Sequence, residues 1–167
     1  MKATRMPRGL RNNNPLNIVR GSSRWIGSKT EVQDTRFCEF EGMKWGFRAA
    51  YRLLWTYWKV YRRQTLGDII YRWCPPTDAS NDTGAYIVSV CKRVSERMGI
   101  TYYASTPLLS PRPQDNSELR REEARLLWVS IAVAMAEVEN GRTACQLCKG
   151  LEQAAQEGYE LAFRPTP

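Results

Sequence analysis

The stretch SELRREEARLLWVSIAVAMAEVENG (residues 117–141) decides the fold. It is built mostly from good helix formers, contains no proline, and reaches its first glycine at Gly141, where a helix commonly ends. Asp115 or Ser117 can cap its start, because both side chains accept hydrogen bonds from backbone N–H groups. At about 100° per residue, one apolar face gathers Ala124, Trp128, Ile131, Ala132, Met135 and Val138. The sequence therefore predicts one long helix that forms the core.

The end of this helix carries a candidate catalytic carboxyl group. Glu139 falls on the apolar face, whereas Glu137 points to the opposite side, where a glutamate is normally solvated. Burial against apolar side chains and the unpaired carbonyls of a helix C-terminus both favour a carboxylic acid that is still protonated near neutral pH. Such a group can protonate the leaving oxygen in glycoside cleavage. The structural alternative is that Glu139 reaches water at a frayed end or pairs with Arg142.

Four further helices are predicted from apolar residues that recur at spacings of three and four. Thr65 can cap one of them, and either Asn81 or Asp82 can cap another that ends at Gly99. Because proline cannot continue a helix, Cys74-Pro75-Pro76 ends the helix that begins at Thr65. The predicted ranges are residues 46–61, 65–74, 81–98 and 143–162.

A small β-hairpin is predicted near the N-terminus. Residues 29–33 and 36–40 favour strands, and Asp34-Thr35 between them favours a turn. The expected fold class is therefore mainly α, with about five helices and one hairpin.

Length and composition predict a single domain over residues 1–167, with flexible tails at 1–7 and 163–167. The apolar share of 43% and the charged share of 25% exclude wholesale disorder. No apolar run approaches the ~20 residues needed to span a bilayer, and the basic N-terminus lacks the apolar segment of a signal peptide. We expect a monomer made in the cytoplasm, which acts at the cell wall if phage lysis, secretion or conjugation delivers it.

The net charge of +8 indicates an anionic partner, such as nucleic acid, a membrane surface or a cell-wall polymer. Basic and aromatic residues alternate in RAAYRLLWTYWKVYRR (residues 48–63). The cations that can line a phosphate-contacting face there are Arg48, Arg52, Lys59, Arg62 and Arg63. No helix-turn-helix or RNA-binding motif accompanies them, so a nucleic-acid-binding module is an alternative rather than the leading hypothesis.

The five cysteines match no disulfide framework, and we expect reduced thiols. Cys145 and Cys148 form a CxxC pair, but no second pair and no histidine completes a zinc site. We therefore expect neither a metal nor a cofactor.

Three short stretches resemble enzymes that cut peptidoglycan. VAMAEVENG (residues 133–141) resembles the helix end of soluble lytic transglycosylases and flagellar-type glucosaminidases, with Glu139-Asn140-Gly141 in place of their Glu-Ser-Gly. DTGAYI (residues 82–87) resembles the Glu-Thr-x-x-Tyr-Val element of the transglycosylases, and residues 12–31 resemble the glucosaminidase stretch with Asn-Asn, Trp-x-Gly and Thr-x-Glu. Because the glutamate helix comes last here, the resemblance implies a circularly permuted lysozyme-like α+β domain.

This resemblance implies roles for individual residues. Glu139 would be the general acid, Tyr86 would orient it or the N-acetyl group of the substrate, and Glu31 would be the second carboxylate, with Asp34 as runner-up. If neither carboxylate comes near Glu139, the resemblance favours a lytic transglycosylase, which can use one glutamate as acid and then as base. The candidate substrate-binding residues are Asn13, Asn17, Trp25, Asp82 and Thr83. Their structural alternatives are turn formation, helix capping and core packing.

The chain as a whole also resembles a family found in bacteriophages and bacterial mobile elements. The resemblance rests on Arg-Asn-Asn-Asn-Pro-x-Asn-Ile at residues 11–18 and Arg-Trp-x-Pro-Pro at residues 72–76, and members are often labelled structural or virion proteins. Three hypotheses follow: an enzyme that cleaves peptidoglycan glycan strands (muramidase, glucosaminidase or lytic transglycosylase), a non-enzymatic phage or mobile-element structural protein, and a nucleic-acid-binding module.

Overall fold

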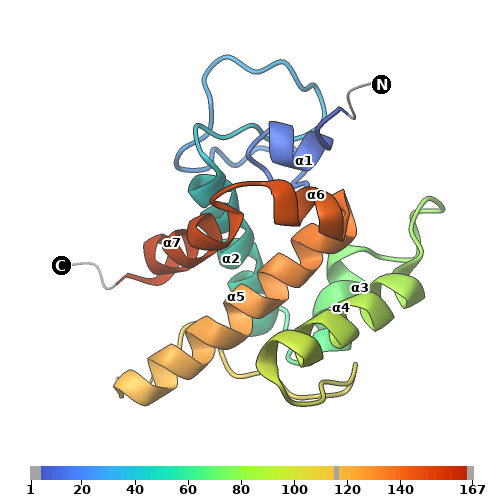
Figure 1. Cartoon of the computed structure of the whole chain (residues 1–167), viewed down its shortest axis with the longest axis vertical. Helices are drawn as coiled ribbons and strands as arrows, with labels where there is room; N and C mark the ends of the chain where they lie inside the picture. The colour runs from blue at the N-terminus through green and yellow to red at the C-terminus, as the bar shows by residue number, and fades with distance from the viewer. Residues whose placement is uncertain (1–4, 115–116, 165–167) are drawn as a thin grey trace. The chain divides into compact units, whose positions relative to one another are not determined.

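The computed structural model describes residues 5–114 and 117–164, which are mainly helical (Figure 1). The helices are α1 (Arg8–Arg11), α2 (Met43–Lys59), α3 (Leu66–Trp73), α4 (Thr83–Met98), α5 (Glu118–Asn140), α6 (Arg142–Leu147) and α7 (Leu151–Phe163). Contacts group the chain into two compact units: unit 1, comprising Met1–Ala50 and Met135–Pro167, and unit 2, comprising Tyr51–Ala134. None of the helices in the described ranges is long and apolar enough to cross a membrane.

Helix α5 confirms the predicted core helix. The backbone N–H of Arg120 donates to Ser117 Oγ at 3.3 Å, so Ser117 caps its start; Asp115, the other candidate, lies outside the described residues. Every residue from Leu127 to Ala136 is at most 5% exposed. A helix buried on all sides belongs to the interior of a domain, so the predicted single apolar face was too narrow.

The predicted boundaries of α3 and α4 are also confirmed in unit 2. Thr65 Oγ1 accepts from the N–H of Asp68 at 3.2 Å and caps α3. Asp82 accepts from the N–H of Ala85 at 3.0 Å and caps α4, which ends at Gly99 with a left-handed φ of 70°. The two helices pack against each other.

The predicted number of helices was too low, because seven occur within the described ranges. The expected helix over residues 143–162 is divided into α6 and α7, since Gly150 adopts a φ of 82° that an α-helix cannot contain. Helix α7 includes Phe163, so the predicted C-terminal tail starts too early. Residues 1–4 and 165–167 of the predicted tails lie outside the described residues.

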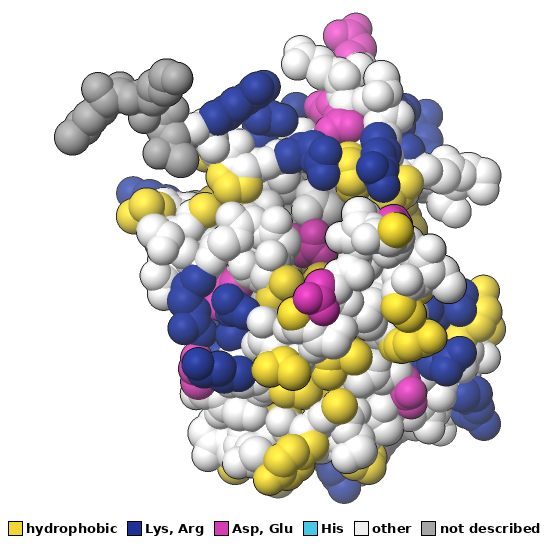
Figure 2. Space-filling view, turned by 90° about the vertical axis from the view of Figure 1, so that its right-hand side faces the viewer, with side chains coloured by type: hydrophobic (Ala, Val, Ile, Leu, Met, Phe, Trp, Pro, Cys, Tyr) yellow, Lys and Arg dark blue, Asp and Glu magenta, His cyan; other side chains and the backbone are white. Residues whose placement is uncertain are grey.

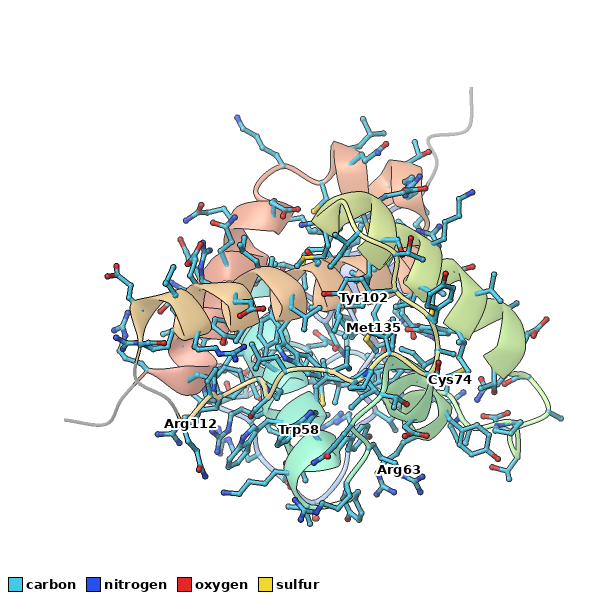
Figure 3. All side chains as sticks on the ribbon, turned by 90° about the horizontal axis from the view of Figure 1, so that it is seen from below. Trp58, Arg63, Cys74, Tyr102, Arg112 and Met135 are labelled. Atoms are coloured by element: carbon cyan, nitrogen blue, oxygen red, sulfur yellow. The ribbon has the colours of Figure 1, made fainter. Side chains whose placement is uncertain are left out.

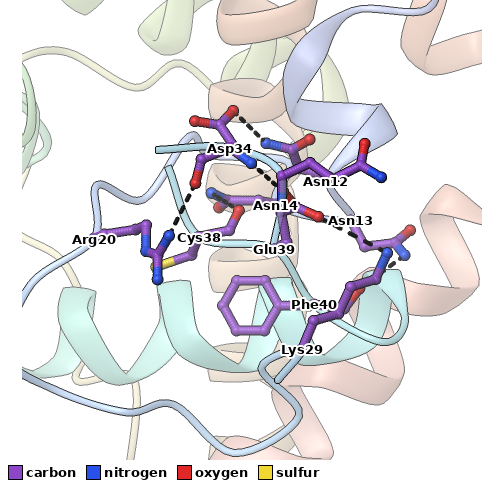
Figure 4. A network of polar contacts seen from close by, with 10 residues as sticks. Asn12, Asn13, Asn14, Arg20, Lys29, Asp34, Cys38, Glu39 and Phe40 are labelled. Carbon is purple, nitrogen blue, oxygen red and sulfur yellow. Dashed lines mark hydrogen bonds and ion pairs between the residues drawn. The ribbon is translucent and has the colours of Figure 1, made fainter. Parts of the chain in front are cut away.

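The predicted hairpin is not confirmed. Residues 19–40 contain two isolated antiparallel bridges, Val19 with Phe37 and Ser28 with Phe40, instead of paired strands. The side chain of Asn14 donates to the carbonyl of Cys38 at 3.0 Å (Figure 4) and to that of Ile18 at 3.0 Å. Side-chain amides thus satisfy backbone groups that a strand ladder would otherwise pair, and the segment folds as an ordered loop.

Two glycines let segments of unit 1 approach α2 closely. A Cβ atom on Gly46 would lie 2.0 Å from the backbone oxygen of Asn13, and one on Gly158 of α7 would lie 2.6 Å from Cβ of Phe47. The start of α2 therefore contacts both the asparagine-rich loop and α7 through backbone that carries no side chain.

We expect Gly46→Ala to destabilise the protein by about 3 kcal/mol, because the added methyl group must displace backbone. Gly84→Ala in α4 is the matched control: the nearest atom to its added Cβ is Asp82 Oδ1 at 3.9 Å, an ordinary contact, and the change should stabilise the protein by up to about 1 kcal/mol. Denaturant unfolding of both variants measures this difference. An unchanged unfolding midpoint for Gly46→Ala would contradict the close approach.

Candidate active site

Glu139 lies in the last turn of α5, within unit 1, and is half-buried. Its Oε2 accepts a hydrogen bond from Asn17 Nδ2 at 2.9 Å. Asn17 has a φ of 52°, in the left-handed region that asparagine enters more readily than most residues. The predicted acid and one predicted substrate-binding residue therefore contact each other, although 122 positions separate them.

Asn140, next to this glutamate, ties the same helix end to the N-terminal loop. Its Nδ2 donates to the carbonyl of Pro15 at 2.7 Å and to that of Ala136 at 2.9 Å. A Cβ on Gly9 would lie 2.4 Å from Asn140 Oδ1 and 3.0 Å from Asn17 Oδ1, so both amides pack against bare backbone. In the sequence, only Asn140-Gly141 after Glu139 pointed to this arrangement. Nothing in the sequence marked Gly9 as part of it.

The prediction that Glu137 is a solvated surface residue is wrong. Its side chain is 11% exposed, and its carboxylate accepts from Arg142 Nε at 3.2 Å. Gly141, with a φ of 90°, turns the chain into α6, and Cys145 Sγ of that helix lies 3.4 Å from the carbonyl of Ala136. The chain after α5 thus folds back over the side of the helix that periodicity assigned to solvent.

The two candidates for a second carboxylate, Glu31 and Asp34, line a polar hollow of about 550 Å³ in unit 1. Its lining contains three cationic and three acidic side chains, and Glu139 is not among them. Glu31 is exposed there. The hollow is therefore a separate feature from the contact between Asn17 and Glu139.

Asp34 anchors the turn at the edge of this hollow. Its Oδ1 accepts from the N–H groups of Phe37 and Arg36, both at 2.9 Å, and its Oδ2 accepts from Asn12 Nδ2 at 2.8 Å. These hydrogen bonds, with those from Phe37 and Arg36 the strongest, stabilise the charged form and lower the pKa of Asp34 to about 2. A carboxylate held in this way is poorly suited to accept a proton during catalysis.

Glu39 is a buried carboxylate that sequence analysis did not single out. It is 7% exposed, and its Oε1 accepts from the N–H groups of Gln33 at 2.7 Å and Asp34 at 2.5 Å (Figure 4). Lys29 Nζ lies 3.9 Å from Oε2. A charged residue between Cys38 and Phe40, in a stretch expected to be a strand, was the signal that could have identified it.

The other predicted residues of unit 1 have structural contacts. Asn13, with a φ of 52°, donates from Nδ2 to the carbonyl of Phe40 at 3.1 Å. Trp25 is half-buried, and its carbonyl accepts from the N–H of Ser28 at 3.1 Å. A Cβ on Gly27 would lie 2.3 Å from the ring of Trp45, so this turn packs on an aromatic side chain.

Three predicted residues lie in unit 2. Asp82 caps α4, and Thr83 Oγ1 donates to the carbonyl of Cys74 at 2.6 Å, which joins the start of α4 to the end of α3. Tyr86 is 8% exposed. Asp82 and Thr83 therefore perform structural tasks, and the approach of Tyr86 to Glu139 stays a prediction.

The CxxC pair lies at the end of α6, with Cys145 in its last turn and Cys148 as its C-cap. Cys145 and Cys148 are free thiols, and burial raises the pKa of Cys148, which favours the neutral thiol over the metal-binding thiolate. Within residues 5–114 and 117–164, no group of three or more His, Cys, Asp or Glu side chains is arranged to hold a metal ion.

The anchored turn predicts a specific loss of stability in acid. The pKa of Asp34 is about 2 in the folded protein, and its ordinary value is 3.8. Its contribution to the free energy of unfolding is therefore complete above pH 4 and is lost as the pH falls through 2. We expect the unfolding midpoint of the wild type to fall more steeply between pH 4 and pH 2 than that of Asp34→Asn, which cannot titrate. Parallel curves would show that Asp34 is not held by these hydrogen bonds.

The chain has a relative among known phage proteins. No protein-family model matches the sequence. Protein P5 of Pseudoalteromonas phage PM2 is 36% identical to the chain over 151 residues, which cover 87% of this chain and 80% of the phage protein. This relation confirms the phage part of the expected resemblance, while the lysozyme-like part stays a prediction. The chain belongs to the family of this phage protein.

Proposed function

We propose that the protein cleaves the glycan strands of peptidoglycan and that Glu139 is the proton donor. The observation that carries this proposal is the contact between Asn17 Nδ2 and Glu139 Oε2 at 2.9 Å, at the end of the buried helix α5. A general acid must be held at a fixed position and must also be reachable. Glu139 meets the first condition through α5 and Asn17, and its half-buried side chain is consistent with the second.

The presence or absence of a second carboxylate near Glu139 distinguishes a hydrolase, which needs two carboxylates, from a lytic transglycosylase, which can use one glutamate. Asp34 is committed to the turn by three hydrogen bonds, and Glu31 lines a hollow to which Glu139 does not contribute. Both observations support the version that needs a single glutamate. The proposed reaction is therefore that of a lytic transglycosylase.

In this reaction Glu139 first acts as an acid and then as a base. The carboxylic acid gives its proton to the glycosidic oxygen as the bond to the sugar C1 breaks, which releases the leaving sugar with a new hydroxyl group. The resulting carboxylate accepts the proton of the C6 hydroxyl of the retained sugar, and that oxygen bonds to C1 to form an anhydro ring. Asn17 orients the carboxyl group through Oε2 in both steps.

A structural role in a phage particle is the second candidate. The relation to a phage protein favours it as much as it favours a lytic enzyme, since both kinds of protein serve phages. The structural role differs from the enzymatic one because it does not require Glu139 to transfer a proton.

Digestion of purified peptidoglycan, followed by mass spectrometry of the released fragments, tests the proposal. We expect the wild type to release fragments with anhydro ends and Glu139→Gln to be slower by about 10²–10⁴-fold, because the amide cannot donate or accept the proton in the same way. Glu137→Gln, two residues away on the same helix, is the matched control and should retain activity, as should Glu31→Gln.

The alternatives give different results. Reducing ends together with loss of activity in Glu31→Gln would indicate a two-carboxylate hydrolase instead. No release from several wall types by well-folded wild type, or equal release by Glu139→Gln, would exclude Glu139 as the acid and favour the structural role.

A further inference from the structure

Unit 2 contains a groove that lies outside the proposed glycan chemistry. It measures about 900 Å³ and is lined by the C-terminal half of α2 and by the loop at residues 108–114. Figure 3 labels Trp58 on α2 and Arg112 on this loop. The charged lining residues are Lys59, Arg62, Arg112 and Arg120, with no carboxylate among the lining residues that are described. Every charged side chain among the described lining residues is therefore basic.

The start of the loop that forms one wall is fixed by hydrogen bonds, two of them from buried or half-buried tryptophan side chains. Trp58 Nε1 donates to the carbonyl of Leu108 at 3.1 Å, and Trp128 Nε1 donates to that of Leu109 at 2.9 Å. The N–H of Leu108 donates to the carbonyl of Gln64 at 2.8 Å. Leu108 and Leu109 are thus held in place, so little ordering entropy is lost in this part of the wall when a ligand binds.

The cations of the groove are available to an anion. Of the described carboxylates, none forms an ion pair with Lys59, Arg62 or Arg112. Arg120 pairs with Glu123 at 3.2 Å, but the two side chains are 52% and 58% exposed, and such surface pairs contribute little. On the face drawn in Figure 2, basic side chains occur in separate groups with carboxylates among them. In the groove, by contrast, the charged side chains among the described lining residues are all cations, and such a hollow concentrates positive potential.

Two partly exposed tryptophans accompany these cations. Trp55 has Lys59 Nζ and Arg52 Cζ each 4.8 Å from a ring centroid, and the hydrogen bond of Trp58 to the loop fixes its ring. Indole rings beside cations are the usual means of holding a single nucleic-acid strand, because bases stack on the rings and phosphates contact the cations. A duplex conceals the faces of its bases, and a lipid headgroup has no ring to stack.

We propose that this groove binds single-stranded nucleic acid, with phosphates on Lys59, Arg62 and Arg112 and a base stacked on Trp55, where it takes the place of the Lys59 ammonium group that lies over the ring in the free protein. Contact with three phosphates predicts that the logarithm of the association constant falls with the logarithm of salt concentration with a slope of about −2. This activity is independent of Glu139, which lies in unit 1.

Fluorescence anisotropy of the full chain with a labelled single-stranded oligo(dT) of about 12–16 nucleotides tests the proposal. We expect Arg62→Ala/Arg112→Ala to weaken binding at low salt by at least about tenfold and to reduce the magnitude of the salt slope by about 1.4. Lys92→Ala/Lys149→Ala removes the same charge from exposed positions outside the groove and should change binding by less than about twofold.

The aromatic contact is tested at Trp55. Trp55→Leu should weaken binding by about tenfold, and Trp55→Phe should restore most of it, because phenylalanine keeps a stacking face. Any of four results would overturn the proposal: no binding at low salt, equal weakening by the control double variant, tighter binding to the duplex of the same sequence, or preferential binding to vesicles that contain phosphatidylglycerol. Because no glycan is present, none of these results bears on Glu139.

Discussion

Hydrogen bonds from asparagine side chains are the constraint on which unit 1 depends. Asn14 satisfies two carbonyls within the loop, Asn140 ties the end of α5 to Pro15, and Asn17 holds Glu139. An amide can donate to a carbonyl without belonging to a strand or helix, so a loop built in this way can be ordered with little regular structure. The same contacts determine where the carboxyl group of Glu139 is held.

Much of the helical framework could be predicted from the sequence, because its signals are local. The caps at Thr65 and Asp82 and the glycine that ends α4 act within one turn of the helix. Helix α5 was recognised from helix-forming residues and the absence of proline. The break between α6 and α7 at Gly150 was missed, because a single glycine does not reveal from sequence alone whether it will adopt a positive φ.

The candidate site was less predictable, because it depends on contacts between distant segments. Periodicity placed Glu139 on a buried helix, yet it could not show that Asn17 would be its partner. It also assigned Glu137 to solvent, since helix geometry alone does not include the later segment that folds over this side. Glu39 was overlooked for a related reason: its partners are backbone N–H groups of a turn, which only the folded loop brings together.

A double-mutant cycle on the contact between Asn17 and Glu139, measured by denaturant unfolding, tests whether Asn17 holds the proposed catalytic acid. Asn17→Gly removes the amide while keeping a residue that tolerates the φ of 52°, and Glu139→Ala removes the acceptor. If Asn17 holds Glu139 through this hydrogen bond, the coupling energy between the two changes should be about 0.5–3 kcal/mol. If the effects add to within about 0.5 kcal/mol, Asn17 does not hold Glu139, and the positioning of the proposed catalytic acid is wrong.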